Sequence, residues 1–272
     1  MIWVDGVGAS VVPADDRGLQ YGDGLFETMR VLRRSVPLLD RHLARLAAGC
    51  VRLALPLPDP ETLRAEITAA CATHDDGVLK LVVTRGSGGR GYRAADAPRL
   101  RRVLSLHPRQ EWPAQTATGA IRARCCSTRL AIGGPLVGLK HLNRLEQVVA
   151  RNEWQDAAIA EGLMRDAEGT FVAGTMTNLF VVRDGALLTP TLDRCGVAGI
   201  ARALVLECAA TLKVEVTEQR ISSAMLAAAD EILVCNSVVG VRPLCELDGR
   251  ALPAAPVAAR LRVATGERGL GA

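Results

Sequence analysis

Two spacings of hydrophobic residues alternate along this chain. Short apolar runs at 78–84 and 178–183 are typical of buried strands, because strands need only four to eight such residues. After Asp40, in contrast, Leu43, Leu46 and Cys50 recur at helical spacing, and Asp40 is a residue type that caps helix N-termini. Strands and helices of this kind recur to the end of the chain. The pattern therefore predicts a mixed α/β protein.

The same two spacings predict the remaining elements. A hairpin is expected at 3–6 and 10–12, and strands at 26–33, 78–84, 102–106, 120–126, 161–165, 170–173, 178–183, 186–189, 214–219, 230–236 and 239–247. Helices are expected at 40–53, 60–73, 141–151, 197–212, 222–228 and 254–263. A length of 272 residues allows two domains, and the segment 112–118 is the best junction. We predict a smaller N-terminal α/β domain at 1–115 and a larger C-terminal domain at 119–272.

Composition narrows the classes of function. The chain is 49% hydrophobic and 23% charged, with a formal net charge of only +4 and 3% aromatic residues. Scattered arginines and few aromatic side chains do not support nucleic-acid binding, whereas a basic site for a small anionic substrate is compatible with them. No apolar run is long enough for a membrane helix, and the N-terminus lacks an export signal. These features predict a cytoplasmic protein without a membrane partner.

The eight cysteines include no C-x-x-C pair, and most lie in apolar surroundings. This pattern favours reduced core residues over a disulfide framework or a zinc site. The four histidines are isolated along the chain, so the sequence predicts no metal site.

One lysine has a special position. Lys140 stands between a glycine-broken loop, 133–138, and the predicted helix 141–151, on which Leu142, Leu145 and Val149 form a stripe expected to face a core. The positive end of a helix and loss of water both disfavour the ammonium form of a lysine. A neutral lysine acts as a covalent amine and general base. The alternative interpretation is an ordinary surface lysine in a first helical turn.

The loop after the strand 78–84 contains G-x-G-x-x-G at 86–91. A dinucleotide-binding fingerprint needs a helix to open at these glycines, so that a pyrophosphate meets its N-terminus. The following residues, 92–98, do not form a convincing helix pattern. We therefore reject a Rossmann interpretation.

Two other segments suit a phosphate group, which requires backbone amides, small residues and usually an arginine. The first is 196–202, where two glycines precede a predicted helix, and the second is 236–240, where Asn236 and Ser237 end a strand. No arginine is singled out by these segments alone. Arg45 lies on the predicted helix 40–53, where it would share a solvated face with Arg41 and Arg52.

The segment 138–146, with the sequence GLKHLNRLE, resembles the cofactor-lysine segment of the fold-type IV pyridoxal-phosphate enzymes. Within them it most resembles the 4-amino-4-deoxychorismate lyases, and the similarity runs from near residue 3 to near residue 248 with several motifs in order. This resemblance implies two α/β domains with pyridoxal 5'-phosphate between them. It also implies a homodimer in which the partner chain closes the site.

The resemblance assigns further residues to the site. Lys140 or Thr28 would be the proton donor that completes pyruvate, and Asn178, from an Asn-Leu-Phe signature, would support the wall around the cofactor ring. The alternative interpretation of Thr28 and Asn178 is that each is an ordinary strand or turn residue. Tyr21 and Glu27 fall in matching motifs without an assigned role. The residues implied to bind the cofactor are Lys140, Arg45, Ala173, Asn178, Val197, Ala198, Gly199, Ile200, Asn236 and Ser237. The residues implied to border the substrate or receive its carboxylates are Arg30, Arg90, Tyr92 and Arg93.

One position departs from the family pattern. Five residues before Asn178 the family has a glutamate that pairs with the pyridine nitrogen of the cofactor and strengthens the ring as an electron sink. This chain has Ala173 there. Glu168 is near in sequence, but a turn at 166–169 makes it a doubtful replacement. Three explanations of Ala173 remain open. The alanine was introduced deliberately in place of the glutamate, or the natural enzyme works without the carboxylate because aromatisation of the product assists the reaction. In the third explanation, the protein is a relative whose chemistry is lost or altered.

The main functional hypothesis is a lyase that releases 4-aminobenzoate and pyruvate from 4-amino-4-deoxychorismate, a step toward folate. Its nearest rival is a transaminase of the same fold acting on D- or branched-chain amino acids. A third hypothesis, favoured by Ala173, is a non-catalytic relative. Retention of Lys140 and of both phosphate segments speaks against the third.

Overall fold

The computed structural model describes residues 1–9, 11–110, 112–113 and 119–271. The chain divides into two compact units, one comprising Met1–Gln110 and Leu139–Asn143 and the other Glu111–Gly138 and Arg144–Ala272. The chain thus returns briefly to the first unit at the segment that carries Lys140. The predicted junction at 112–118 lies largely outside the described residues.

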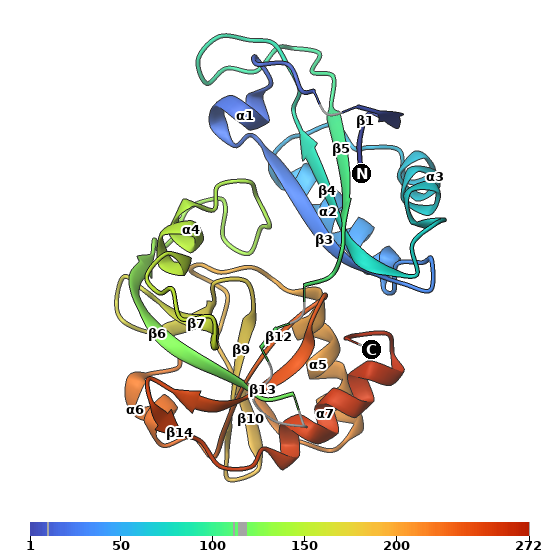
Figure 1. Cartoon of the computed structure of the whole chain (residues 1–272). Helices are drawn as coiled ribbons and strands as arrows, with labels where there is room; N and C mark the ends of the chain where they lie inside the picture. The colour runs from blue at the N-terminus through green and yellow to red at the C-terminus, as the bar shows by residue number, and fades with distance from the viewer. Residues whose placement is uncertain (10, 111, 114–118, 272) are drawn as a thin grey trace. The chain divides into compact units, whose positions relative to one another are not determined.

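The first unit is an antiparallel sheet covered by helices (Figure 1). Its strand order is β2-β1-β5-β4-β3. The strands are β1 Ile2–Val4, β2 Val7–Gly8, β3 Gly24–Leu32, β4 Asp76–Thr84 and β5 Arg101–His107. The helices are α1 Arg17–Tyr21, α2 Leu39–Arg52 and α3 Pro60–Cys71.

The core of the first unit forms where the apolar stripes of α2 and α3 meet the sheet. Leu43, Leu46 and Cys50 of α2 are buried, as their helical spacing predicts. They share one cluster with Met29 and Val31 of β3, which alternate with outward-facing residues along the strand. Asp59 caps α3 by accepting a hydrogen bond from the Thr62 amide, and Pro60 occupies the first helical position.

The opening hairpin is shorter than predicted. Its two arms are β1 and β2, which pair Val4 with Val7. Asp5 and Gly6 both have positive φ and form a tight two-residue turn, so the second arm begins earlier than residue 10. Residue 10, the start of the predicted arm, lies outside the described residues.

The second unit is built on a nine-stranded sheet with the path β11-β10-β9-β12-β13-β6-β7-β8, with β14 paired to β13. An additional β8–β9 pairing closes six of these strands into a ring. The strands are β6 Ile121–Leu130, β7 Ile159–Asp166, β8 Phe171–Gly174, β9 Asn178–Arg183, β10 Ala186–Thr189, β11 Val216–Glu218, β12 Glu231–Asn236, β13 Gly240–Leu247 and β14 Arg250–Ala251. The helices are α4 Leu145–Arg151, α5 Ile200–Thr211, α6 Ser223–Ala227 and α7 Pro256–Glu267.

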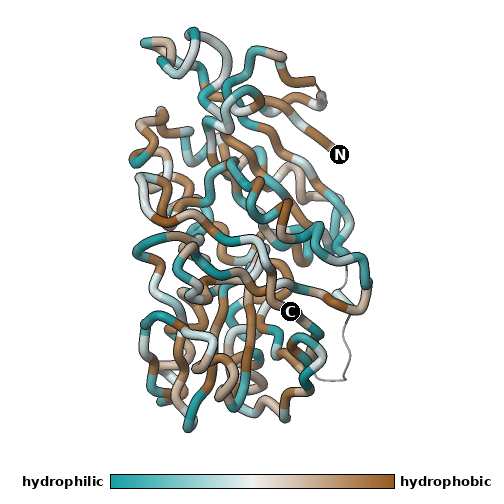
Figure 2. Tube along the Cα trace, turned by 90° about the vertical axis from the view of Figure 1, so that its left-hand side faces the viewer, coloured by the Kyte–Doolittle hydropathy of each residue, from teal (hydrophilic) through white to brown (hydrophobic). Residues whose placement is uncertain are grey.

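Apolar side chains from the central strands fill the second unit. Leu179 and Val181 of β9 face Ile232 and Val234 of β12 in one buried cluster. Figure 2 shows short hydrophobic stretches, in brown, alternating with hydrophilic ones, in teal, along the trace. Among the described residues, no helix combines the length and hydrophobicity that crossing a bilayer requires.

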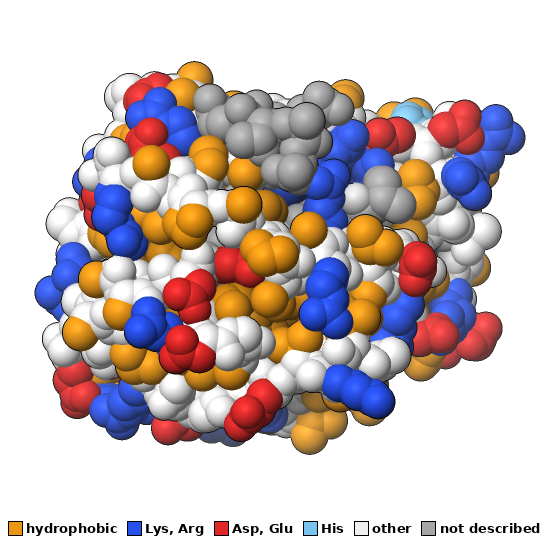
Figure 3. All heavy atoms as spheres, turned by 90° about the horizontal axis from the view of Figure 1, so that it is seen from below, with side chains coloured by type: hydrophobic (Ala, Val, Ile, Leu, Met, Phe, Trp, Pro, Cys, Tyr) orange, Lys and Arg blue, Asp and Glu red, His pale blue; other side chains and the backbone are white. Residues whose placement is uncertain are grey.

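Surface charge is mixed on the face seen in Figure 3. Lys and Arg side chains alternate there with Asp and Glu side chains, with small hydrophobic patches between them. The described side chains seen on this face therefore form no continuous basic surface of the kind that a nucleic-acid backbone requires.

Candidate active site

Lys140 lies in an extended segment beside the first strand residues of β3. Phe26 donates its backbone N–H to the Lys140 carbonyl at 3.0 Å, and His141 forms an antiparallel bridge with Leu25. The Lys140 amine lies 4.1 Å from the centroid of the Phe26 ring. Phe26 and Thr28 point to the same side of β3 because strand side chains alternate. The structure thus places Lys140 and Thr28 on one face of the first unit.

This geometry corrects the prediction that Lys140 begins a helix. The helix α4 starts only at Leu145, so its dipole does not act at the lysine. The ring face of Phe26 instead favours a cation beside it. The predicted core stripe is also wrong, since Leu145 and Val149 are exposed, with 77% and 55% of their surface accessible. Helical spacing alone did not reveal which side of this short helix meets the sheet.

Behind the same strand lies a buried polar cluster. Glu27 of β3 is only 1% exposed and accepts hydrogen bonds from Arg45, whose Nε lies 2.8 Å from Oε1. His42 Nδ1 lies 2.7 Å from Glu27 Oε2. Burial by itself raises the pKa of Glu27, but the hydrogen bonds and charges of His42 and Arg45 outweigh it and lower the pKa below its usual value. Arg45 is therefore not a freely solvated helix residue: Glu27 fixes its guanidinium.

The four residues predicted to meet the substrate have different surroundings. Arg30 is buried and forms an ion pair with Asp76 on the neighbouring strand. Arg90, Tyr92 and Arg93 lie together on an exposed loop, and Tyr92 has 90% of its surface accessible. Residues 91–100 contain no helix. The glycines at 86–91 therefore do not open a helix, which agrees with our rejection of a dinucleotide-binding fingerprint.

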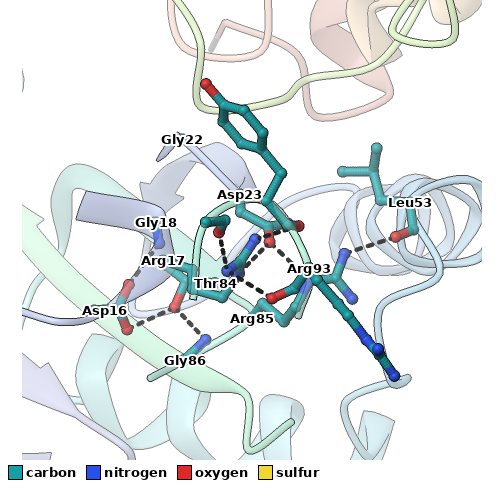
Figure 4. Close-up of polar contacts among 12 residues, drawn as sticks. Asp16, Arg17, Gly18, Gly22, Asp23, Leu53, Thr84, Arg85, Gly86 and Arg93 are labelled. Carbon is teal, nitrogen blue, oxygen red and sulfur yellow. Dashed lines mark hydrogen bonds and ion pairs between the residues drawn. The ribbon is translucent and has the colours of Figure 1, made fainter. Parts of the chain in front are cut away.

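Arg17 holds this loop through its guanidinium group (Figure 4). Its guanidinium is buried and donates to the carbonyls of Gly91 at 3.1 Å and Tyr92 at 3.0 Å, while its Nε donates to Asp23 at 2.9 Å. Arg85 donates to the same Asp23 carboxylate at 2.8 Å. Burial raises the pKa of Asp23, but the two arginines more than offset it, so that the pKa is lowered. The loop therefore extends from a rigid ionic support.

In the second unit, a turn before α5 offers unused backbone donors. The amides of Val197, Gly199 and Ile200 donate no hydrogen bond to any described residue. Ala198 uses its amide to bind the carbonyl of Gly138 at 3.0 Å. The first turn of α5 also has no side-chain cap. Donors at a helix start suit a phosphate, so these residues fit the phosphate group of the implied cofactor.

Asn178 joins this turn to the second predicted phosphate segment. Its side-chain Nδ2 donates to the Val197 carbonyl at 2.9 Å, and its backbone pairs with Cys235 next to Asn236. Asn236 Oδ1 accepts the amides of Val238 and Val239, each at 2.9 Å. Asn236 thus shapes its own loop, and the structure brings the two predicted segments to either side of Asn178.

A Cβ at Gly199 would overlap Asn178 Oδ1, so we predict a steric effect from Gly199→Ala. The backbone of Gly199, with φ of −74°, accommodates alanine, which leaves the clash as the cause. We expect the free energy of unfolding to fall by about 1–3 kcal/mol in urea denaturation. Asn178→Ala removes the clashing oxygen, so the double variant should lose less than the sum of the two single losses. Additive losses would contradict this explanation.

Ala173 lies directly opposite Asn178 and Met164 in the sheet and is 7% exposed. It packs in an apolar cluster with Met164, Trp154 and Cys195. Glu168 lies in the turn before β8, where it pairs with Arg194 and Arg220. Glu168 therefore does not replace the family glutamate, and the space beside Ala173 is apolar.

Three buried charged residues received no role in the sequence interpretation: Arg17, Glu27 and Glu161. Glu27 and Glu161 are charged residues within largely apolar segments, which is a usable signal because charges are rarely buried without a partner. Arg17 follows Asp15 and Asp16 and gives no such signal. The partners of the three residues come from segments up to 76 residues away, as with Arg17 and Arg93. Sequence spacing therefore gave no indication of them.

Comparison with known proteins defines the class. The sequence profile of the amino-transferase class IV family matches residues 24–247, which is most of the chain. The chain belongs to this family. The resemblance recognised in the sequence and the predicted mixed α/β fold are both confirmed.

Within this family, the similar proteins include lyases and aminotransferases. The crystal structure of 4-amino-4-deoxychorismate lyase from Pseudomonas aeruginosa superimposes with a TM-score of 0.93 at 48% identity, covering 98% of each chain. Aminodeoxychorismate lyase of Vibrio harveyi is 32% identical over 244 residues, 90% of each chain. A putative branched-chain-amino-acid aminotransferase of Methanocaldococcus jannaschii is 31% identical over 241 residues, covering 87% of this chain and 83% of its own.

Proposed function

We propose that this protein is a pyridoxal-phosphate-dependent lyase that converts 4-amino-4-deoxychorismate to 4-aminobenzoate and pyruvate. The observation that carries the proposal is the full-length similarity to a lyase at 48% identity. The aminotransferases match less closely in structure: a branched-chain aminotransferase from Thermoproteus uzoniensis has 25% identity and a TM-score of 0.85. Folate biosynthesis is the pathway that this reaction serves.

The cofactor assignment is supported by residues in each unit. Lys140 supplies the amine that would hold the cofactor covalently, and the free amides around Gly199 would bind its phosphate. Gly138 exchanges two hydrogen bonds with the turn at 196–198, and Lys140 follows Gly138 by two residues in the sequence. Arg45, oriented by Glu27, would add a positive charge. Bound pyridoxal phosphate supplies an electron sink for the carbon that carries the substrate amine.

The remaining chemistry is proton transfer by the chain's own residues. The substrate amine would first replace Lys140 on the cofactor, which frees Lys140 Nζ. The freed amine would take the proton from the amine-bearing carbon, after which the enolpyruvyl group leaves and the ring becomes aromatic. Lys140 Nζ or Thr28 Oγ1 would then deliver a proton to the departing three-carbon group to complete pyruvate. Both side chains lie on one face of β3, so that either can reach the same substrate in this proposal. Arg30, Arg90, Tyr92 and Arg93 would receive or border the substrate carboxylates.

A direct assay separates the two enzymatic hypotheses. We expect pyruvate and 4-aminobenzoate to appear in equal amounts from 4-amino-4-deoxychorismate, with little amino transfer from D-alanine or a branched-chain amino acid to a 2-oxo acid. Dominant amino transfer would establish the transaminase instead. Absence of both reactions in cofactor-loaded protein would favour the non-catalytic relative.

Ala173 provides a test of how the cofactor is activated. Ala173→Glu puts a carboxylate on the side of the sheet that Asn178 occupies, where the family has its glutamate. We expect the lyase rate to rise about tenfold, the equivalent of one charge-assisted hydrogen bond. Ala173→Gln, which has the same size without the charge, is the control. Equal rates for the two variants would show that this site works without a ring carboxylate.

The proposal also includes the location and the assembly of the protein: a homodimer in the cytoplasm. All eight cysteines are free thiols, which is consistent with a reducing compartment. The exposed side chains of Leu145, Val148 and Val149 on α4 offer an apolar surface for a second copy. Sedimentation equilibrium tests the dimer, and a monomer at micromolar concentration would refute it.

A further inference from the structure

Glu161 of β7 is a fully buried carboxylate, 0% exposed, that the mechanism above does not use. No cation pairs with it among the described residues; its partners are neutral donors. Oε1 accepts the amides of Gly162 at 2.9 Å and Thr175 at 3.0 Å and the Thr175 hydroxyl at 2.5 Å. Oε2 accepts the Thr177 hydroxyl at 2.9 Å and the Met176 amide at 3.3 Å. Four of these five donors come from a single turn.

Burying a carboxylate without a cation costs free energy, which its hydrogen bonds must offset. The donors around Glu161 therefore have to be placed accurately. Burial raises the pKa of Glu161, and the hydrogen bonds from Thr175, Gly162 and Thr177 oppose that rise. The turn also packs tightly on the carboxylate. A Cβ at Gly174 would overlap the Thr177 hydroxyl and press on the carboxylate of Glu161. Only glycine permits this approach.

The turn, residues 174–177, connects β8 to β9 and touches both predicted phosphate segments. It ends at Asn178, whose side chain donates to the Val197 carbonyl at 2.9 Å. On its other side, Asn236 Nδ2 donates to the Met176 carbonyl at 3.3 Å. The position of the turn therefore sets the position of the donors on each side of it.

We propose that Glu161 is a positioning residue for phosphate binding: it fixes the turn 174–177, which in turn aligns the amides near Gly199 with the loop at Asn236. The ligand chemistry is a phosphate monoester. This inference rests on the proposed function, because that function places the cofactor phosphate at these donors. Glu161 itself does not touch the ligand.

The test compares pyridoxal phosphate with pyridoxal, which lacks the phosphate group. Cofactor-free full-length protein is titrated with each compound, and the ratio of the two affinities isolates the contribution of the phosphate. In Glu161→Gln, the amide oxygen can keep the donors of Gly162 and Thr175, whereas the amide nitrogen faces the Met176 N–H and loses that contact. We expect pyridoxal phosphate to bind about tenfold more weakly, the equivalent of one hydrogen bond to a charged group. Pyridoxal affinity should change less than about twofold.

Matched variants at Thr177 keep the test valid if Glu161→Gln folds poorly. Thr177→Val removes the hydroxyl that binds Oε2 while keeping the shape, and we expect it to reproduce the selective loss. Thr177→Ser keeps the hydroxyl and should bind both compounds as the unaltered protein does. A parallel loss of both affinities, or no loss in either Glu161→Gln or Thr177→Val, would overturn the inference. An unaltered protein that does not prefer pyridoxal phosphate to pyridoxal would overturn the cofactor proposal and this inference with it.

Discussion

Lys140→Ala should reduce the lyase rate by at least about 10³-fold, the scale expected when a group that transfers the proton is removed. The lysine would provide both the covalent attachment and the base, so no neighbour replaces it. Lys140→Arg should fail equally, because an arginine remains protonated and neither bonds to the cofactor nor accepts a proton. Borohydride treatment followed by peptide mapping should place a pyridoxyl group on the Lys140 peptide of the unaltered protein and on no peptide of the variants.

The control for this prediction is Lys80→Ala. Lys80 lies 5.2 Å from the centroid of the same Phe26 ring and belongs to the same unit, but it is exposed and has no role in the proposed reaction. We expect its rate to stay within about threefold of the unaltered protein, since surface substitutions have small effects. Lys140→Ala should remain folded, because a cation–π contact contributes only about 0.5–1 kcal/mol at a partly exposed site. Retention of a tenth of the activity by folded Lys140→Ala would refute the assignment.

Glu27→Ala should lower the free energy of unfolding by about 3–5 kcal/mol, because it leaves the charge of Arg45 without its buried partner. The variant should also weaken binding of pyridoxal phosphate, since Arg45 would no longer be held in one orientation. Urea denaturation and cofactor titration measure the two effects. Glu61→Ala is the matched control: Glu61 is an exposed carboxylate of the same unit that lies 3.7 Å from Arg64, and its loss should cost at most about 1 kcal/mol.

Glu27 should also contribute to acid sensitivity. Its pKa in the folded protein lies below the usual value of 4.5, so the unfolded chain binds the proton more readily. The resulting stabilisation is complete above pH 4.5 and disappears as the pH falls through the lowered pKa. Glu27→Gln should therefore show a shallower loss of stability below pH 4.5 than the unaltered protein. An identical acid dependence in the two proteins would show that Glu27 is not perturbed.

The sequence by itself determined most of the elements and the family. The strand at 78–84 and the helix at 40–53 follow from local rules, because strand and helix spacings leave a direct record in the order of residues. The predicted cap is wrong: α2 begins at Leu39, so Asp40 lies inside the helix and Leu38 precedes it. The segment 138–146 was recognisable for a similar reason: its chemistry is carried by adjacent residues. The function could therefore be predicted before the fold was known.

Only the tertiary structure decided the surroundings of the site. Lys140 is next to Phe26 because an extended segment pairs with β3, not because a helix begins there. Apart from the adjacent Gly162 amide, the partners of the buried carboxylates of Glu27 and Glu161 lie 14 to 18 positions away in the sequence, in a neighbouring helix and in a turn. Hydrogen bonds of this kind depend on how separate elements pack. A single sequence records the residue types of such a network but not which of them meet.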